Sequence, residues 1–226
     1  MEGKGKAFIF ASAIIHFFEF MKFFEQLKSI DLILASQSPR RRELLKDAGI
    51  PFRVWAIPCH EKFPAELPPH DIALHLCRQK AEPFKAQISD KSIVITADTI
   101  VVKDKQILNK AGNVMQARQM LTLLSGTTHQ VITGVCLTSR KKQVDFYENT
   151  QVTFASLSPE EIDFYISNFK PFDKAGAYGI QEWIGLTGVD RIEGSWHNVV
   201  GLPVAALYRN LKDFIKDHIP LDNPIQ

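Results

Sequence analysis

The sequence predicts an α/β protein, because segments with the pattern of buried strands alternate with segments that begin and end like helices. An apolar run at residues 32–35 leads directly into a helix start, and a β-branched run covers residues 92–102. Two further β-rich runs, at residues 128–138 and 143–155, are joined by a short basic turn and predict a hairpin. The length of 226 residues, with 45% apolar and 23% charged residues, fits an ordinary globular protein of one large domain or two small ones.

The first strand-to-helix junction carries an unusual charge pattern. Ser38 is the predicted helix cap, Pro39 the first helical position and Gly49 the end of the helix. The first turn of a helix exposes unpaired N–H groups and favours acidic residues, but here it holds arginines at positions 40–42. This conflict predicts that an anion, such as a polyphosphate, binds at the helix end through amides, hydroxyls and guanidinium groups. The alternative is a solvated basic turn whose apolar side packs on the core.

The remaining elements follow from apolar spacing and from cap residues. Further strands are predicted at residues 51–57 and 106–110, and helices at residues 70–82, 113–124, 158–168 and 203–217. Ser158 opens a capping box with the usual acidic first turn, which makes the basic turn at positions 40–42 more unusual. Gln181 is predicted to start another strand, and the predicted loops cover residues 58–69, 171–181 and 194–203.

Asp98 is a second anomaly, because it stands in the middle of the β-branched run at residues 92–102. An aspartate inside such a strand is disfavoured both by propensity and by burial unless it is paired or binds a cation. The alternative is a strand–turn–strand arrangement in which Asp98 belongs to the turn.

Charge and cysteine content argue against several classes of function. The chain has 27 basic and 25 acidic residues, and a net charge of +2 gives no broad footprint for a nucleic-acid partner. Cys59, Cys77 and Cys136 are widely spaced and fit a reducing compartment, so we expect a cytoplasmic location. The sequence has no Walker-type loop, no G-x-G-x-x-G motif after a strand and no histidine pair with zinc spacing.

Residues 1–30 differ in composition from the rest of the chain. Lys4 and Lys6 precede a Phe-rich apolar run at residues 7–18, which is far shorter than the roughly 20 apolar residues that a membrane span needs. We predict an appended helix, or an artefact of start-site choice, and no membrane span. A targeting or membrane-associated segment is the alternative.

Five motifs, taken in this order, resemble those of the Maf family, also called septum formation inhibitor proteins. They are Leu34-Ala35-Ser36-Gln37-Ser38-Pro39-Arg40-Arg41, Ala97-Asp98-Thr99, Leu124-Ser125-Gly126, Asp173 through Gln181, and Val200-Gly201-Leu202-Pro203. The match extends from about Asp31 to the C-terminal helix. We therefore expect a Maf-like nucleotide pyrophosphatase domain at residues 31–218, with residues 1–30 as an extension outside the match.

The resemblance implies a nucleoside triphosphate pyrophosphatase. The expected fold is a mixed central sheet flanked by helices with a long substrate cleft, as in Maf and ITPase-like proteins. The expected reaction cleaves the α–β phosphoanhydride of a nucleoside triphosphate, which yields a monophosphate and pyrophosphate with the help of a divalent metal, Mg or Mn. The resemblance also implies clearing of nucleotide pools, a link to cell-division arrest, and a homodimer, because family members are often dimeric. The near-zero net charge predicts no stable nucleic-acid partner.

The resemblance carries roles onto individual residues. Asp98 matches the catalytic aspartate, and Glu61 is expected to join it in handling metal and attacking water. The residues expected to bind phosphate are Ser36, Ser38, Arg40, Arg41, Lys80, Lys110 and Lys174. The chain departs from the family pattern at two places. One is Asn109-Lys110-Ala111, and the other is Glu182-Trp183, which follow Gln181 at a point where the family commonly has a glycine.

Arg40, Thr99 and Gln181 match the three positions that set substrate choice in the dTTP and UTP subgroup. An amide such as that of Gln181 offers a donor and an acceptor to the imide edge of a pyrimidine. Two alternatives stay open: a non-catalytic nucleotide-binding regulator of septum formation, and a pyrophosphatase for modified nucleotides such as 7-methyl-GTP. A basic-patch nucleic-acid binder is disfavoured by the near-zero net charge.

Overall fold

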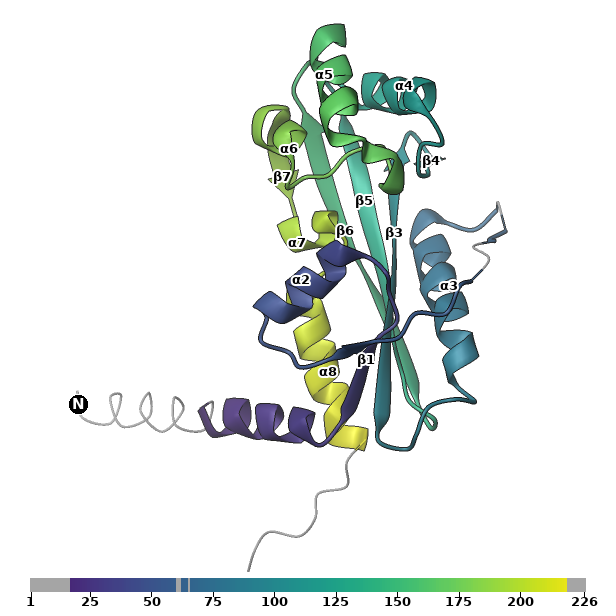
Figure 1. Cartoon of the computed structure of the whole chain (residues 1–226), viewed down its shortest axis with the longest axis vertical. Helices are drawn as coiled ribbons and strands as arrows, with labels where there is room; N and C mark the ends of the chain where they lie inside the picture. Colours follow the sequence, from purple (N-terminus) through teal and green to yellow (C-terminus); the bar gives the residue numbers. More distant parts are fainter. Residues whose placement is uncertain (1–16, 60–61, 65, 219–226) are drawn as a thin grey trace, which may run out of the picture.

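A seven-stranded mixed β-sheet forms the centre of the protein, and helices cover both of its faces (Figure 1). The computed structural model describes residues 17–59, 62–64 and 66–218. The strands are β1 (Asp31–Leu34), β2 (Arg53–Val54), β3 (Ser92–Lys103), β4 (Gln106–Leu108), β5 (Thr128–Thr138), β6 (Gln143–Phe154) and β7 (Val189–Glu193). Their order is β2-β1-β3-β5-β6-β7, with β4 paired to β3. β1 is parallel to β2 and β3, and the other pairs are antiparallel, which confirms the predicted fold class.

The helices lie in two layers. They are residues 17–28, α2 (Pro39–Asp47), α3 (Pro69–Ala81), α4 (Val114–Leu124), α5 (Pro159–Phe169), α6 (Trp183–Thr187), α7 (Trp196–Val200) and α8 (Val204–His218), with short 3-10 helices η1 (Glu82–Phe84) and η2 (Pro171–Asp173). α3 covers one face of the sheet, and α2, α7 and α8 lie on the opposite face (Figure 1). α4 packs against α5 near one end of the long strands (Figure 1).

β3 is buried on both faces, and its alternate residues face different cores. Ile95 belongs to the main core together with Leu211 of α8, whereas Ile100 packs with Ile72 and Leu76 of α3. Because side chains alternate along a strand, Asp98 faces α3 and the next residue of β3 faces the opposite layer. The central strand therefore presents functional side chains to both layers of helices.

The cap residues behave as the sequence predicts. The Ser38 hydroxyl accepts a hydrogen bond from the Arg41 amide at the start of α2, with Pro39 in the first turn, and Asn113 caps α4. Ser158 and Glu161 form the predicted capping box of α5. These local signals are sufficient because each cap satisfies backbone N–H groups of its own helix.

Three predictions from the sequence are wrong, and one alternative is excluded. The strand at residues 51–57 shrinks to Arg53–Val54, because β1 offers only Ile33 and Leu34 as partners before the chain leaves the sheet. Asp98 lies within the continuous strand β3, which excludes the turn alternative. Gln181 starts no strand, because it belongs to a turn closed by the Glu182 amide on the Gly179 carbonyl. Residues 194–203 contain the short helix α7 in addition to loop, and a helix of five residues is too short to show apolar periodicity.

The described part of the N-terminal extension packs on the domain. Residues 17–28 are helical, and Phe23 and Leu27 are buried with 3% and 1% exposure. The Phe23 ring meets the ring of Tyr208 on α8 edge to face, with centroids 5.0 Å apart. Within the described residues, no helix combines the length and apolarity needed to cross a membrane.

Candidate active site

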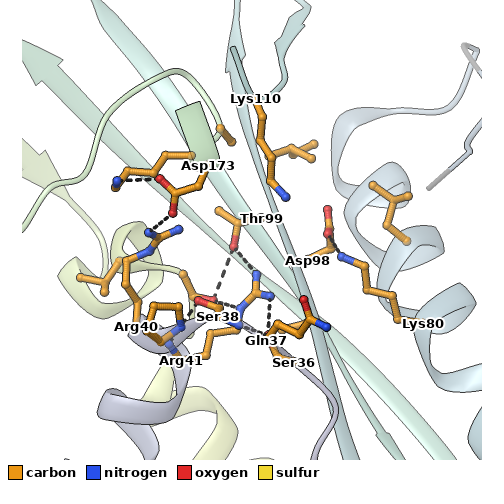
Figure 2. Close-up of a pocket in the computed structure, with 18 of the residues that line it drawn as sticks. Ser36, Gln37, Ser38, Arg40, Arg41, Lys80, Asp98, Thr99, Lys110 and Asp173 are labelled. Atoms are coloured by element: carbon orange, nitrogen blue, oxygen red, sulfur yellow. Dashed lines mark hydrogen bonds and ion pairs between the residues drawn. The ribbon is translucent and has the colours of Figure 1, made fainter. Parts of the chain in front are cut away.

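A cleft with a cavity volume of about 780 Å³ lies where the end of β1, the start of α2, the middle of β3 and the loop after η2 meet. Ten residues that the sequence predicts for the site line it: Ser36, Ser38, Arg40, Arg41, Lys80, Asp98, Thr99, Lys110, Lys174 and Gln181. Most of them are labelled in Figure 2 and point toward a common space. Glu61, the predicted partner of Asp98 in metal binding, lies outside the described residues.

The topology of the sheet creates this cleft. β1 pairs with β3 only as far as Ile95, and the chain then turns away through residues 35–38 into α2. Residues 97–99 of β3 therefore extend beyond the carboxyl end of β1 and have no strand beside them on that side. Ligands in α/β proteins commonly bind beyond the carboxyl ends of parallel strands, which is where Asp98 and Thr99 lie.

Asp98 forms an ion pair with Lys80, which stands in the last turn of α3. The two side chains are only 11% and 18% exposed, so each charge needs a partner in this partly buried position. In Figure 2 the pair lies on the side of the cleft that faces α3. This placement satisfies the condition under which an aspartate is tolerated inside an apolar strand.

Gly134 allows α3 to come close enough for this ion pair. It is the residue of β5 directly opposite Asp98, and a Cβ at this position would lie 2.4 Å from the Ala73 carbonyl oxygen of α3. A side chain at position 134 would therefore push α3 and Lys80 away from the sheet.

Arg41 is held in place by acceptors from distant parts of the chain. Its Nε donates to the Gly201 carbonyl at 2.7 Å, its Nη2 to the Thr99 hydroxyl at 3.1 Å and its Nη1 to the Ser36 hydroxyl at 3.4 Å. The Thr99 hydroxyl also lies 2.9 Å from that of Thr133 on β5. These bonds orient the guanidinium inside the cleft (Figure 2).

Arg40 and Lys174 share one carboxylate. Arg40 Nη1 lies 2.9 Å from Asp173 Oδ2, and Lys174 Nζ lies 2.7 Å from Asp173 Oδ1. Lys174 also pairs with Glu182 Oε1 at 3.0 Å, and its side chain is 9% exposed. Burial alone would raise the pKa of Asp173, but the hydrogen bonds from Lys174 and Arg40 outweigh it and keep the pKa below its usual value. The Lys174 ammonium is thus engaged by two carboxylates in this structure.

Lys110 and Gln181 are the more exposed members of the site. Lys110 follows β4 and forms an isolated bridge with Ala175, which ties the loop after β4 to the loop after η2. In Figure 2 its side chain extends into the cleft. Gln181 lies in the turn at residues 179–182 on the cleft wall.

The carboxylates that the structure describes at the cleft suit a metal ion that is held partly by the phosphates of a bound substrate. Among the described residues, no group of three or more His, Cys, Asp or Glu side chains is placed to enclose a cation. Mg²⁺ commonly uses one or two carboxylates and completes its shell with substrate phosphates and water. The Asp98 carboxylate lines the cleft and fits the role of the protein ligand in such a coordination shell.

Several residues that build the site were not predicted for it. They are Asp173, Glu182, Tyr165, Thr133 and Asn198. Asp173 and Glu182 pair with Lys174, and Thr133 contacts Thr99, whereas Tyr165 and Asn198 in turn hold Glu182 and Thr133. Asp173 was detectable as the neighbour of Lys174 in an otherwise small-residue loop. No local pattern marks the other four, because their partners lie at least eight residues away in the sequence.

Comparisons with known proteins agree with the geometry. A family model described as Maf-like protein matches residues 31–214. A dTTP/UTP pyrophosphatase of Porphyromonas gingivalis is 49% identical over 193 residues, which cover 84% of this chain and 97% of that protein. A protein of the same name from Phocaeicola vulgatus is 51% identical over 189 residues, covering 83% and 98%. Another from Cytophaga hutchinsonii is 46% identical over 200 residues, covering 88% and 91%.

Proposed function

The chain belongs to the Maf-like protein family, and from this premise we propose that it is a hydrolase that cleaves dTTP and UTP to the monophosphate and pyrophosphate. The observation that carries the proposal is the single cleft that gathers ten predicted site residues from across the described sequence. Its cations and hydroxyls suit a polyphosphate, and the Asp98 carboxylate suits hydrolysis.

The phosphate chain is expected to lie along the cations of the cleft. Arg41 is oriented in advance by three acceptors, and Arg40, Lys80 and Lys110 surround the same space. Guanidinium and ammonium groups fixed before substrate arrives stabilise the charge that develops during phosphoanhydride cleavage. Lys174 reaches a phosphate only if its pairs with Asp173 and Glu182 open.

Asp98 is the residue that activates the attacking water. In the step, the water oxygen bonds to the α-phosphorus, one proton passes to the Asp98 carboxylate, and pyrophosphate leaves with the bridging oxygen. Lys80 orients the carboxylate by pairing with it. A divalent cation held by Asp98 and the phosphate oxygens would neutralise negative charge on the phosphates.

The base is read by Arg40, Thr99 and Gln181. The Gln181 amide provides one donor and one acceptor, which match the imide edge of thymine and uracil. A site built for one hydrogen-bonding edge rejects other bases because its own polar groups would lose their partners. We further propose that the protein acts in the cytoplasm as a homodimer and clears nucleotide pools, with free nucleotides as its substrates.

The test is a nucleotide panel with Mg²⁺ or Mn²⁺, in which pyrophosphate release is measured. We expect dTTP and UTP to have the highest kcat/KM, and Gln181→Glu to lose that preference while the fold is retained. The highest kcat/KM for 7-methyl-GTP or a standard purine triphosphate would contradict the substrate assignment. Tight nucleotide binding with no pyrophosphate from any nucleotide would instead indicate a non-catalytic regulator.

A further inference from the structure

Glu182 connects Lys174 and the turn at Gly179, which both line the cleft, with Tyr165 of α5. It precedes α6, and its side chain is 19% exposed. One carboxylate oxygen lies 3.0 Å from Lys174 Nζ, and the other accepts a hydrogen bond from the Tyr165 hydroxyl. Tyr165 lies on α5 and is fully buried, and its hydroxyl also accepts a hydrogen bond of 2.9 Å from the Gly179 amide. Burial first, and then the bond to Glu182, raise the pKa of Tyr165, so the hydroxyl remains a donor.

The same residue closes the turn that carries Gln181. The Glu182 amide donates to the Gly179 carbonyl at 3.0 Å, which makes Gln181 the third residue of a four-residue turn. The Glu182 carboxylate folds back over this turn so closely that a Cβ at Gly179 would lie 2.8 Å from its carbon. The Gln181 side chain makes no hydrogen bond to other described residues, so the backbone of the turn is what fixes the point on the cleft wall from which it extends.

The contacts continue across the cleft to α2. Lys174 Nζ lies 3.0 Å from Glu182 Oε1 and 2.7 Å from Asp173 Oδ1. The other oxygen of Asp173 lies 2.9 Å from Arg40 Nη1 on α2. Positive and negative charges alternate along this path, so each ion lies between partners of opposite sign. Removing one carboxylate would leave the nearly buried Lys174 ammonium with half of its compensation.

We infer that Glu182 is a positioning residue for base selection, which aims Gln181 by holding the turn at residues 179–182 and links it to Arg40 through Lys174. This inference rests on the proposed function and adds a residue that contacts neither the phosphates nor the reacting atoms. By the same inference, the role of Lys174 is to hold the cleft wall in place through its ion pairs with Asp173 and Glu182.

The kinetic test compares Glu182→Gln with the wild type. The substitution keeps the shape and the turn amide but removes the charge that pairs with Lys174. We expect KM for dTTP to rise and the kcat/KM ratio of dTTP to dGTP to fall by about tenfold, with kcat changed less than about threefold. The double variant Glu182→Gln with Gln181→Ala is expected to be no less selective than Gln181→Ala alone. Glu193→Gln, in the exposed strand β7, is the matched control.

A second measurement follows the turn in the absence of nucleotide. Hydrogen exchange of the Gly179 and Glu182 amides is expected to accelerate in Glu182→Gln and in Tyr165→Phe, which loses the acceptor of the Gly179 amide. Unchanged exchange and selectivity in a folded Glu182→Gln protein would overturn the inference. If the wild type cleaves neither dTTP nor UTP, the proposed function fails, while exchange still decides whether Glu182 holds the turn. Should Glu182→Gln not fold, Tyr165→Phe tests the same link.

Discussion

Among single residues, Asp98 shows how a local conflict in the sequence becomes a functional arrangement. A carboxylate in the middle of a buried strand is costly unless a partner or a cation compensates it. Lys80 supplies that partner from α3, and the remaining carboxylate surface faces the cleft. The sequence marked the anomaly, whereas the partner became visible only in three dimensions.

The Asp98→Asn variant is expected to fold and to lose turnover. The amide has nearly the same shape but cannot accept the proton of water, and a general base commonly contributes about 10² to 10⁴ in rate. The measurements are kcat with dTTP and the thermal midpoint. Asp104→Asn, at an exposed turn position next to β3, is the control and should keep full activity. Near-normal turnover by Asp98→Asn would remove Asp98 from the mechanism.

His129 is expected to make the fold sensitive to acid. Burial, with a smaller effect of Lys103, lowers its pKa from 6.5 to about 4 in the folded protein. Between these values the unfolded chain binds a proton that the folded chain does not, so the free energy of unfolding decreases as pH falls from about 6.5 toward 4. Linkage gives a loss of about 2 kcal/mol at pH 5 relative to neutral pH.

Urea denaturation at pH 7 and pH 5 measures this effect. His129→Gln keeps a polar side chain next to Tyr178 and should lose most of the difference between the two pH values. His70→Gln, at a half-exposed position on α3, should keep it. The same pH dependence in His129→Gln and in the wild type would show that another group is responsible.

Among the elements, α3 and the N-terminal helix have different relations to the site. α3 carries Lys80 and lies against β5 at Gly134, where the glycine permits close contact of the two backbones. The helix at residues 17–28 packs on α8 through Phe23, which meets Tyr208, and it buries Leu27 in the main core; none of its residues lines the cleft. The first element is therefore expected to affect catalysis, and the second to affect stability.

Gly134→Ala is expected to reduce activity without removing any functional group. The new Cβ would overlap the Ala73 carbonyl, so α3 must shift and carry Lys80 away from Asp98. Overpacking of this kind costs about 1–3 kcal/mol. The test measures kcat and the free energy of unfolding, with Gly112→Ala as the control because its nearest contact is the flexible Gln116 side chain. Unchanged kcat would show that the ion pair tolerates movement of α3.

Removal of residues 1–20, so that the chain starts at Met21, is expected to leave activity intact. The described residues that it deletes, including Phe17 and Phe18, are exposed, whereas the buried Phe23 and Leu27 remain. Phe23→Ala in the full chain should lower the free energy of unfolding by about 3 kcal/mol, and Phe18→Ala should have little effect. Comparable losses for the two variants would show that Phe23 is not part of the core.

For the protein as a unit, the mixed sheet explains why one cleft collects residues from the whole domain. The short β1 ends beside the long β3, and the uncovered part of β3 meets α2, α3 and the loops after β4 and η2. A triphosphate in this cleft would contact both layers of helices at once. Binding of substrate with metal should therefore stabilise the fold as a unit.

Chelation of divalent metal is expected to stop hydrolysis and to leave the thermal midpoint of the protein without nucleotide unchanged. The described residues form no cluster of three or more metal-ligating side chains, and for this reason we expect the cation to need substrate phosphates to complete its shell. Adding dTTP and Mg²⁺ together to Asp98→Ala, which cannot complete the site, should raise the midpoint less than in the wild type. A large drop of the midpoint on chelation alone would indicate a structural metal.

The sequence by itself determined the α/β class, most element positions, the helix caps and ten of the residues that line the cleft, because these depend on local periodicity, cap chemistry and ordered motifs. Only the tertiary structure decided that Lys80 pairs with Asp98 and that the Gly201 carbonyl accepts a hydrogen bond from Arg41, 160 positions earlier in the chain. The same holds for the ion pairs of Lys174 with Asp173 and Glu182. The charges of these residues are visible in the sequence, but their pairing depends on strand register and helix packing. Those are set by the burial of apolar surface over the whole domain, and no local pattern encodes them.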